Sequence, residues 1–217
     1  MGIIDNGIED FEIKDGVLVK YKGKDYTVVI PDSVTTIGER AFEWCTSIVR
    51  ITIPDSVTSI GNEAFDGCHS LVEINIPSSV TRIGYDAFFK CVSLINIDIP
   101  NSVTSIGGGA FHDCTSLESI TLPSALTVIN MCMFQGCLLL RNVTIPASIT
   151  SIRDEAFIGC VSLQSINIPS SVTSIGEEAF AYCKRLKTIY NHSNLDIQKG
   201  SDTHGMIAKY AEKVVKL

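Results

Sequence analysis

The chain has no long apolar run, few basic residues and no recognisable leader at its start. No segment approaches the roughly 20 consecutive apolar residues that a membrane-spanning helix requires, so we expect no membrane insertion. The opening, MGIIDNGIEDFEIKDG, has neither a basic start nor an apolar core and does not resemble a signal peptide. Lysine and arginine total 17 against 24 acidic residues, which gives a net charge of −7. A nucleic-acid partner is therefore not expected, because it requires a basic face.

Proline, phenylalanine and cysteine are not scattered but recur with one period. Residues 30–190 form seven units of 23 residues, or 161 residues without an insertion. All seven prolines keep this spacing, at Pro31, Pro54, Pro77, Pro100, Pro123, Pro146 and Pro169. Seven of the eight cysteines keep it too, at Cys45, Cys68, Cys91, Cys114, Cys137, Cys160 and Cys183. The phenylalanines between them are Phe42, Phe65, Phe88, Phe111, Phe134, Phe157 and Phe180. Such self-similarity predicts a repeat architecture.

Each unit reads L-x-x-I-x-I-P-x-S-V-T-x-I-G-x-x-A-F-x-x-C-x-S. Its first part, such as LVEINIP from Leu71, alternates apolar and polar residues and predicts a strand with one buried face. The proline lacks an N–H and marks the end of that strand. SVTSIG predicts a second short extended segment, and G-x-x-A-F-x-x-C predicts a single helical or 3₁₀ turn. One unit cannot bury its apolar face alone, so we expect the units to stack as a solenoid.

This pattern resembles the leucine-rich repeats, and more closely the BspA-like or Treponema-type subclass, whose units run L-x-x-I-x-L-P-x-x-L-x-x-I-G-x-x-A-F-x-x-C. The resemblance covers about three quarters of the chain and every defining position of the unit. It implies an α/β-type leucine-rich repeat, a curved right-handed solenoid with a parallel sheet on its concave side. It also implies a secreted or surface-displayed module of bacteria or protozoa that serves in binding and adhesion.

We expect one continuous domain with a cap at each end, because a bare solenoid end exposes core and strand edges. In residues 1–29, Asp15-Gly16 and Lys22-Gly23 are turn signals that predict a three-stranded antiparallel meander. In residues 191–217, Ser201, Asp202 and Thr203 precede an apolar helical face and predict a terminal helix. That face consists of Met206, Ile207, Tyr210, Ala211 and Val214.

The eight cysteines could form disulfides, bind a metal or fill the core as free thiols. Disulfides between units are disfavoured because side chains in a stacked ladder point in parallel. A metal site is not expected either, since the only close pair, Cys132 and Cys137, has no histidine near it in sequence. We therefore expect buried thiols that fill the core. Cys132 is the exception and is predicted to be the exposed, readily alkylated thiol. Its slot holds polar residues or glycine in the other units, at Arg40, Glu63, Asp86, Gly109, Glu155 and Glu178.

No catalytic or cofactor-binding constellation is evident, and we expect a protein that is not an enzyme and needs no cofactor. The histidines His69 and His112 lie in slots that otherwise hold small or polar residues, which indicates a solvated surface. The GGGAF stretch from Gly107 lacks the G-K-[ST] sequence that a phosphate-binding loop needs. Serine is abundant only because SVTS recurs.

The strand positions that point away from the core vary between units and form the candidate binding surface. Val49, Val72 and Ile95 predict an apolar row, and Glu73, Asp98 and Glu118 predict an acidic cluster in neighbouring units. Arg50, Arg141 and Lys187 flank that cluster, and Tyr190 adds an aromatic ring. Calcium is not expected on these carboxylates because they lie on adjacent strands without a ligand loop.

This surface predicts a protein partner with a basic, partly apolar ridge, on a host or on a cell surface. A glycan ranks second, since only Tyr190 offers a stacking platform. The alternative is a structural spacer, a presenting domain of a larger surface protein with no partner of its own. Seven free thiols are unusual outside the cell, so a cytoplasmic location stays open beside the secreted or surface location that the resemblance implies.

Overall fold

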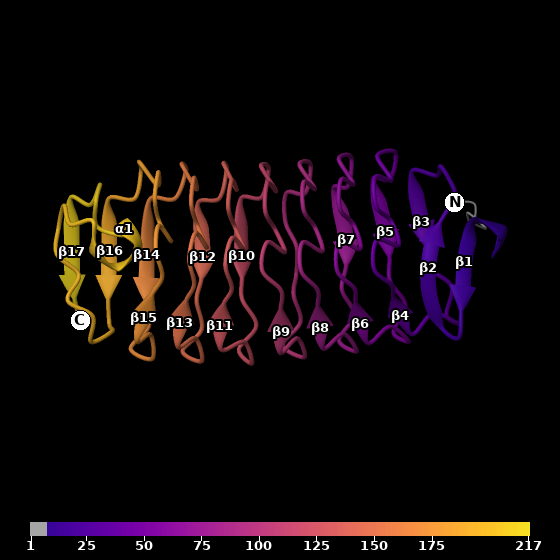
Figure 1. Cartoon of the computed structure of the whole chain (residues 1–217), viewed down its shortest axis with the longest axis horizontal. Coiled ribbons are helices and arrows are strands. Elements are labelled where there is room, and N and C mark those ends of the chain that lie inside the picture. The colour runs from indigo at the N-terminus through magenta and orange to yellow at the C-terminus, as the bar shows by residue number, and fades with distance from the viewer. Residues whose placement is uncertain (1–7) are drawn as a thin grey trace.

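The computed structural model describes residues 8–217, which form a rod of stacked turns (Figure 1). A 3₁₀ turn, η1 (Ile8–Asp10), leads into an antiparallel hairpin of β1 (Phe11–Lys14) and β2 (Val17–Tyr21). Asp15 and Gly16 connect the two strands with φ angles of 50° and 77°. From there the chain winds along the rod, and every later strand pairing is parallel.

Two rows of parallel strands run along the rod (Figure 1). The long-strand row comes from the L-x-x-I-x-I-P part of the repeat and contains β3 (Thr27–Val29), β5 (Arg50–Thr52), β7 (Glu73–Asn75), β10 (Ser119–Thr121), β12 (Asn142–Thr144), β14 (Ser165–Ile168), β16 (Thr188–Asn191) and β17 (Lys213–Lys216). The short-strand row comes from the V-T-x-I part and contains β4 (Thr36–Ile37), β6 (Ser59–Ile60), β8 (Arg82–Ile83), β9 (Ser105–Ile106), β11 (Val128–Ile129), β13 (Ser151–Ile152) and β15 (Ser174–Ile175). Partners are one period apart, as in Arg50↔Glu73 and Ser59↔Arg82.

A column of phenylalanine rings runs through the core, which also contains buried isoleucine, leucine, valine, alanine and cysteine side chains of the repeat. The seven phenylalanines that recur with the repeat, from Phe42 to Phe180, are fully buried, and each ring stacks on the next with centroids 5.0 to 5.6 Å apart. Tyr21 of the hairpin extends this column, since its ring centroid lies 5.3 Å from that of Phe42. Phe11 lies 5.1 Å beyond Tyr21. The hairpin therefore caps the core with aromatic rings of its own.

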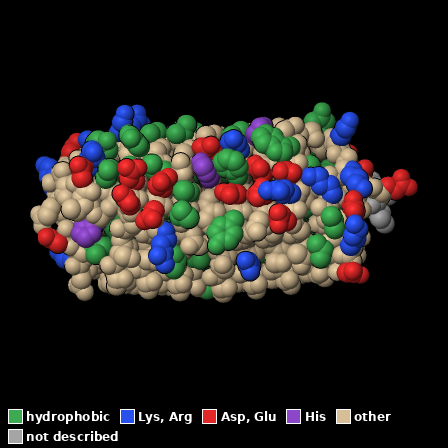
Figure 2. Space-filling model, viewed as in Figure 1, with side chains coloured by type: hydrophobic (Ala, Val, Ile, Leu, Met, Phe, Trp, Pro, Cys, Tyr) green, Lys and Arg blue, Asp and Glu red, His purple; other side chains and the backbone are tan. Residues whose placement is uncertain are grey.

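The prediction of a parallel leucine-rich repeat solenoid is confirmed, with two turns more than the repeat count. Strand β3 precedes the strands of the seven units and β17 follows them, so the described chain makes nine turns. On the face seen in Figure 2, acidic side chains gather in a band along the rod, with basic side chains beside them. Within residues 8–217, no helix is long and apolar enough to cross a membrane.

The predicted three-stranded meander is a two-stranded hairpin. Strand β3 pairs in parallel with β5 instead of antiparallel with β2, and β2 pairs in parallel with β4. Residues 22–26 do not form a tight turn; Tyr21 donates its hydroxyl to Asp25 Oδ2 at 2.9 Å across this segment. The loop thereby carries the chain to the long-strand row rather than back along the hairpin.

The prediction of a terminal helix is wrong except for a single turn. Helix α1 spans only Thr203–Met206, and His204 and Gly205 inside it have left-handed φ angles of 48° and 64°. Phe180 N donates to Gly205 O at 2.8 Å, as Phe157 N donates to Ala179 O in the unit before. The segment therefore repeats the turn of a unit, and the chain then enters β17, which pairs with β16.

Candidate binding site on the strand face

The outward side chains of the long-strand row form a surface that we call the strand face. Within each strand the burial alternates, as in β5, where Ile51 is buried between the exposed Arg50 and Thr52. Of the ten residues predicted to bind a partner, Val49 and Tyr190 are half-buried. The other eight are exposed: Arg50, Val72, Glu73, Ile95, Asp98, Glu118, Arg141 and Lys187.

The long-strand row is interrupted at the segment 95–98, and again between β12 and β14. Strand β7 pairs with β5, and β10 pairs with β12, but 95–98 pairs with neither neighbour as a strand. Across residues 8–217, one backbone hydrogen bond joins this segment to the adjoining strands, from Glu118 N to Ile95 O at 3.0 Å. The edge of β7 that faces this segment therefore lacks the backbone hydrogen bonds that a regular parallel ladder would form there.

A hollow of about 460 Å³ lies at this interruption. It brings together four of the predicted residues, Val72, Glu73, Ile95 and Asp98. Ile74, Asn75, Ile76 and Asn96 complete its lining. Two aliphatic side chains, two carboxylates and two amides therefore surround one opening on the strand face, together with the buried isoleucines below.

The predicted acidic cluster is only partly assembled. Glu73 and Asp98 share the hollow, whereas Glu118 belongs to the next turn and does not line it. Arg50 Nε lies 3.0 Å from Glu73 Oε2, so the charge of Glu73 is shared with a neighbouring strand. Asp98 has no basic group within 4 Å among the residues that the structure describes, which leaves it the freer of the two carboxylates.

The remaining predicted residues lie elsewhere on the strand face. Lys187 and Tyr190 line a second hollow of about 520 Å³ with Gln164, Ser165, Arg185 and Thr188. Lys187 Nζ also lies 3.2 Å from Glu212 Oε1. Arg141 lines neither hollow. Arg185 was missed by the prediction because it lies outside the alternating positions of its strand.

The cysteine ladder has a hydrogen-bonding role in addition to filling the core. Each buried thiol from Cys68 to Cys183 donates to the carbonyl oxygen of the phenylalanine in the preceding unit, at 3.1 to 3.3 Å. Burial raises the pKa of these thiols, to about 12 for Cys183. A protonated thiol is the form that can donate, so burial keeps this group in its bonded state.

Cys132 is half-buried, as is Cys45. Its Sγ lies 3.8 Å from Glu155 Oε2 in the next turn. Burial, and then the negative charge of Glu155, raise the pKa of the Cys132 thiol. Its slot also has a left-handed backbone, with φ of 55°, which the sequence did not reveal. The expected ready alkylation of Cys132 stays a prediction.

The family model for the BspA type leucine rich repeat region matches the chain in six copies, over residues 20–138 and 106–201. Comparison with curated protein sequences gives no match.

Two solved structures resemble the chain in sequence as well as in fold. A leucine rich cell surface protein from Faecalibacterium prausnitzii is 38% identical with a TM-score of 0.78, and the match covers 82% of this chain and 50% of that one. The leucine rich repeat protein of T. pallidum, TpLRR, is 35% identical with a TM-score of 0.80, over 83% of this chain and 90% of that one. The chain thus spans half the length of the first relative and most of the second.

Proposed function

Because the chain belongs to the BspA-type leucine-rich repeat family, we propose that it binds a protein partner through the strand face, at the surface of a cell. Leucine-rich repeat proteins generally bind proteins or act as scaffolds, and such solenoids are typically non-catalytic. Stacked units create an extended surface for this purpose. Our proposal is more specific and assigns the contact to the hollow beside β7.

The main support for this binding site is the combination of apolar and acidic groups at the hollow. Val72 and Ile95 are 38% and 41% exposed, although both are large aliphatic side chains. Glu73 and Asp98 lie in the same lining. Binding surfaces commonly pair an apolar centre with a polar rim, and opposite charge steers the partner into place. The matching partner has a basic, partly apolar ridge.

A surface location is supported by the relative from F. prausnitzii, which is a cell surface protein. Adhesion is the role we propose for the chain there, with a host or cell-surface protein as its ligand. A glycan is a weaker fit because Tyr190, the aromatic platform expected for it, is half-buried and lies at the second hollow.

The test is capture from host-cell surface and matrix proteins by the native chain and by the variant Glu73→Lys, Asp98→Lys, Glu118→Lys. We expect a partner that the native chain retains and the variant loses. The melting temperature should change little, because all three side chains are exposed and the ion pair of Glu73 with Arg50 lies at the surface. The matched control reverses three exposed carboxylates outside the strand face, Asp32→Lys, Asp55→Lys and Glu177→Lys. This control should retain the partner despite the same change in net charge.

Two outcomes would contradict the proposal. Loss of the partner from both variants would mean that net charge, rather than the hollow, holds it. A native chain that captures no partner would favour the spacer, a rod that presents other domains. The twofold length of the F. prausnitzii relative supports that alternative, since there the matched region is half of a longer chain.

A further inference from the structure

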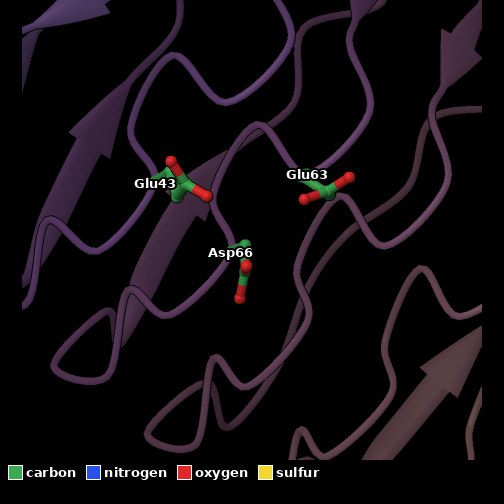
Figure 3. A group of neighbouring side chains, drawn as sticks. All are labelled: Glu43, Glu63 and Asp66. Carbon is green, nitrogen blue, oxygen red and sulfur yellow. The ribbon is translucent and has the colours of Figure 1, made fainter.

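Three carboxylates from neighbouring turns converge beside the phenylalanine column. Glu43 follows Phe42 in one turn, and Glu63 and Asp66 flank Phe65 in the next. One oxygen atom from each side chain lies within 4.8 Å of the others (Figure 3). Glu43 and Asp66 occupy the same slot of successive units, so the stacking of the solenoid itself places them together.

Asp66 is the unusual member of this group. The residue is only 8% exposed, and its Oδ1 atom has no hydrogen-bond partner among residues 8–217. Burial raises the pKa of the Asp66 carboxyl, and the charges of Glu43 and Glu63 raise it further. A buried carboxyl oxygen without a partner is costly, so a ligand for it is expected.

The neighbouring cations satisfy the two glutamates but not Asp66. Arg40 donates to both oxygens of Glu63, with Nε–Oε2 of 2.7 Å and Nη2–Oε1 of 2.9 Å. Arg40 Nε also lies 3.5 Å from Glu43 Oε1, and Lys20 Nζ lies 3.7 Å from Glu43 Oε2. Within 4 Å, three negative charges therefore face two positive ones. Lys90, whose positive charge also acts on Asp66, forms no ion pair within 4 Å of it among the described residues.

We propose that Glu43, Glu63 and Asp66 bind a hard divalent cation, with Ca²⁺ as the best fit. The ligand atoms are all carboxylate oxygens, which Ca²⁺ prefers, and the partly exposed glutamates leave room for the water molecules that complete its coordination. Asp66 supplies the buried anchor. This site is separate from the strand face, so the two proposals stand or fall independently.

Arg40 competes with the cation for Glu63. Its side chain is 50% exposed and lies within 4.0 Å of Glu39, which offers it a partner outside the three-carboxylate cluster. Binding of a cation is expected to release Arg40 from Glu63 toward Glu39 and solvent, since two cations at one carboxylate repel each other. The affinity is therefore moderate, with a dissociation constant of roughly 0.1 to 1 mM, as in extracellular calcium modules.

The test is calorimetric titration of the chelator-treated full chain with CaCl₂, alongside its melting temperature with and without CaCl₂. We expect saturable binding of one Ca²⁺ per chain and a rise in melting temperature. Asp66→Asn should abolish both, yet melt higher than the native chain when no cation is present, because it removes a buried, repelled carboxylate. Glu178→Gln is the matched control, since Glu178 occupies the slot of Glu63 with a similar φ of 50°. It should bind as the native chain does.

Arg40→Gln should have the opposite effect to Asp66→Asn on Ca²⁺ affinity. Removing the guanidinium that competes for Glu63 should tighten Ca²⁺ binding about tenfold or more. A merely structural role for Asp66 would not produce this gain. No saturable binding to the native chain would overturn the proposal and leave Asp66 neutralised by a proton. Equal binding by Asp66→Asn and the native chain would overturn it as well, because the anchor would then be irrelevant.

Discussion

At the scale of single residues, phenylalanine and cysteine act as a pair that joins successive units. Cys114 Sγ donates to Phe88 O at 3.2 Å, while the Phe88 and Phe111 rings stack with their centroids 5.5 Å apart. The period in the sequence predicted that both are buried. It did not reveal the hydrogen bond, because the partner carbonyl lies 26 residues away and belongs to another turn.

Phe111→Ala is expected to lower the free energy of unfolding by about 3–5 kcal/mol, since the ring is fully buried between Phe88 and Phe134 and its loss leaves a cavity. Urea unfolding of both proteins measures the difference. A loss below about 1 kcal/mol would show that the ring does not belong to the core.

Cys132 is expected to be the first thiol labelled by a maleimide in the native chain, but more slowly than a free cysteine. The thiolate is the reactive form, and a raised pKa reduces its population at a given pH. The rate should therefore increase as the pH rises toward that pKa. Glu155→Gln removes a negative charge beside Sγ, lowers the pKa and should accelerate labelling at constant pH. Mass mapping that finds Cys132 unmodified while Cys45 reacts would contradict the prediction.

At the scale of the element, each turn depends on two residues with left-handed backbone. In the second unit these are Glu63 and Gly67, with φ of 53° and 68°. Their N–H groups donate to Tyr85 O at 2.8 Å and Phe89 O at 2.9 Å, so the unusual backbone directs bonds toward the next turn. The sequence predicted a turn here but not this conformation, because every unit has a residue other than glycine at one or both positions.

At Gly107 two successive turns touch so closely that a side chain would collide with the neighbouring backbone. A Cβ atom at Gly107 would lie 2.4 Å from Tyr85 N and 2.6 Å from the Gly84 carbonyl carbon. Both are backbone atoms and cannot move aside, so Gly107→Ala should reduce stability by about 1–3 kcal/mol. Thermal unfolding against Ser78→Ala, an exposed position in a loop, provides the comparison. Equal melting temperatures would show that the turns can separate without cost.

The terminal helix illustrates why a pattern can mislead at the end of a repeat array. Met206, Ile207 and Ala211 have helical spacing, and the prediction of a helix was reasonable on that basis. In the structure Ile207, Ala208 and Ala211 are buried against the last unit, while residues with left-handed backbone break the helix. Packing against the preceding turn determines the conformation of this segment, and the local sequence pattern contains no information about that packing.

At the scale of the whole molecule, each turn contacts only its neighbours. The candidate site depends on this arrangement: residues with suitable chemistry could be predicted from their slots, but the hollow could not. It arises because the segment 95–98 fails to pair with β7, although its sequence fits the repeat as well as any other. Small differences in how two turns stack are not encoded in a consensus.

Deleting residues 84–106 should leave a folded, shorter solenoid, because Ile83 then precedes Gly107 in the same register as it precedes Gly84. Circular dichroism should retain the β signal with a cooperative melt. Deleting only residues 84–95, about half a period, should abolish the cooperative melt. The strand segments on one side of the deletion would then lie beside turn segments on the other side and could not pair with them. A well-folded half-period variant would show that register does not hold the rod together.

The stacking direction also determines how the rod would respond to tension. Its strands run across the long axis, so a force applied at the two ends would open hydrogen bonds and stacked rings one turn at a time instead of shearing a whole sheet. Each turn occupies about 5 Å of the rod, whereas its 23 residues, once released, extend to about 80 Å. Such a chain would yield by unwinding in equal steps, and would lengthen many times over before its last turn opened.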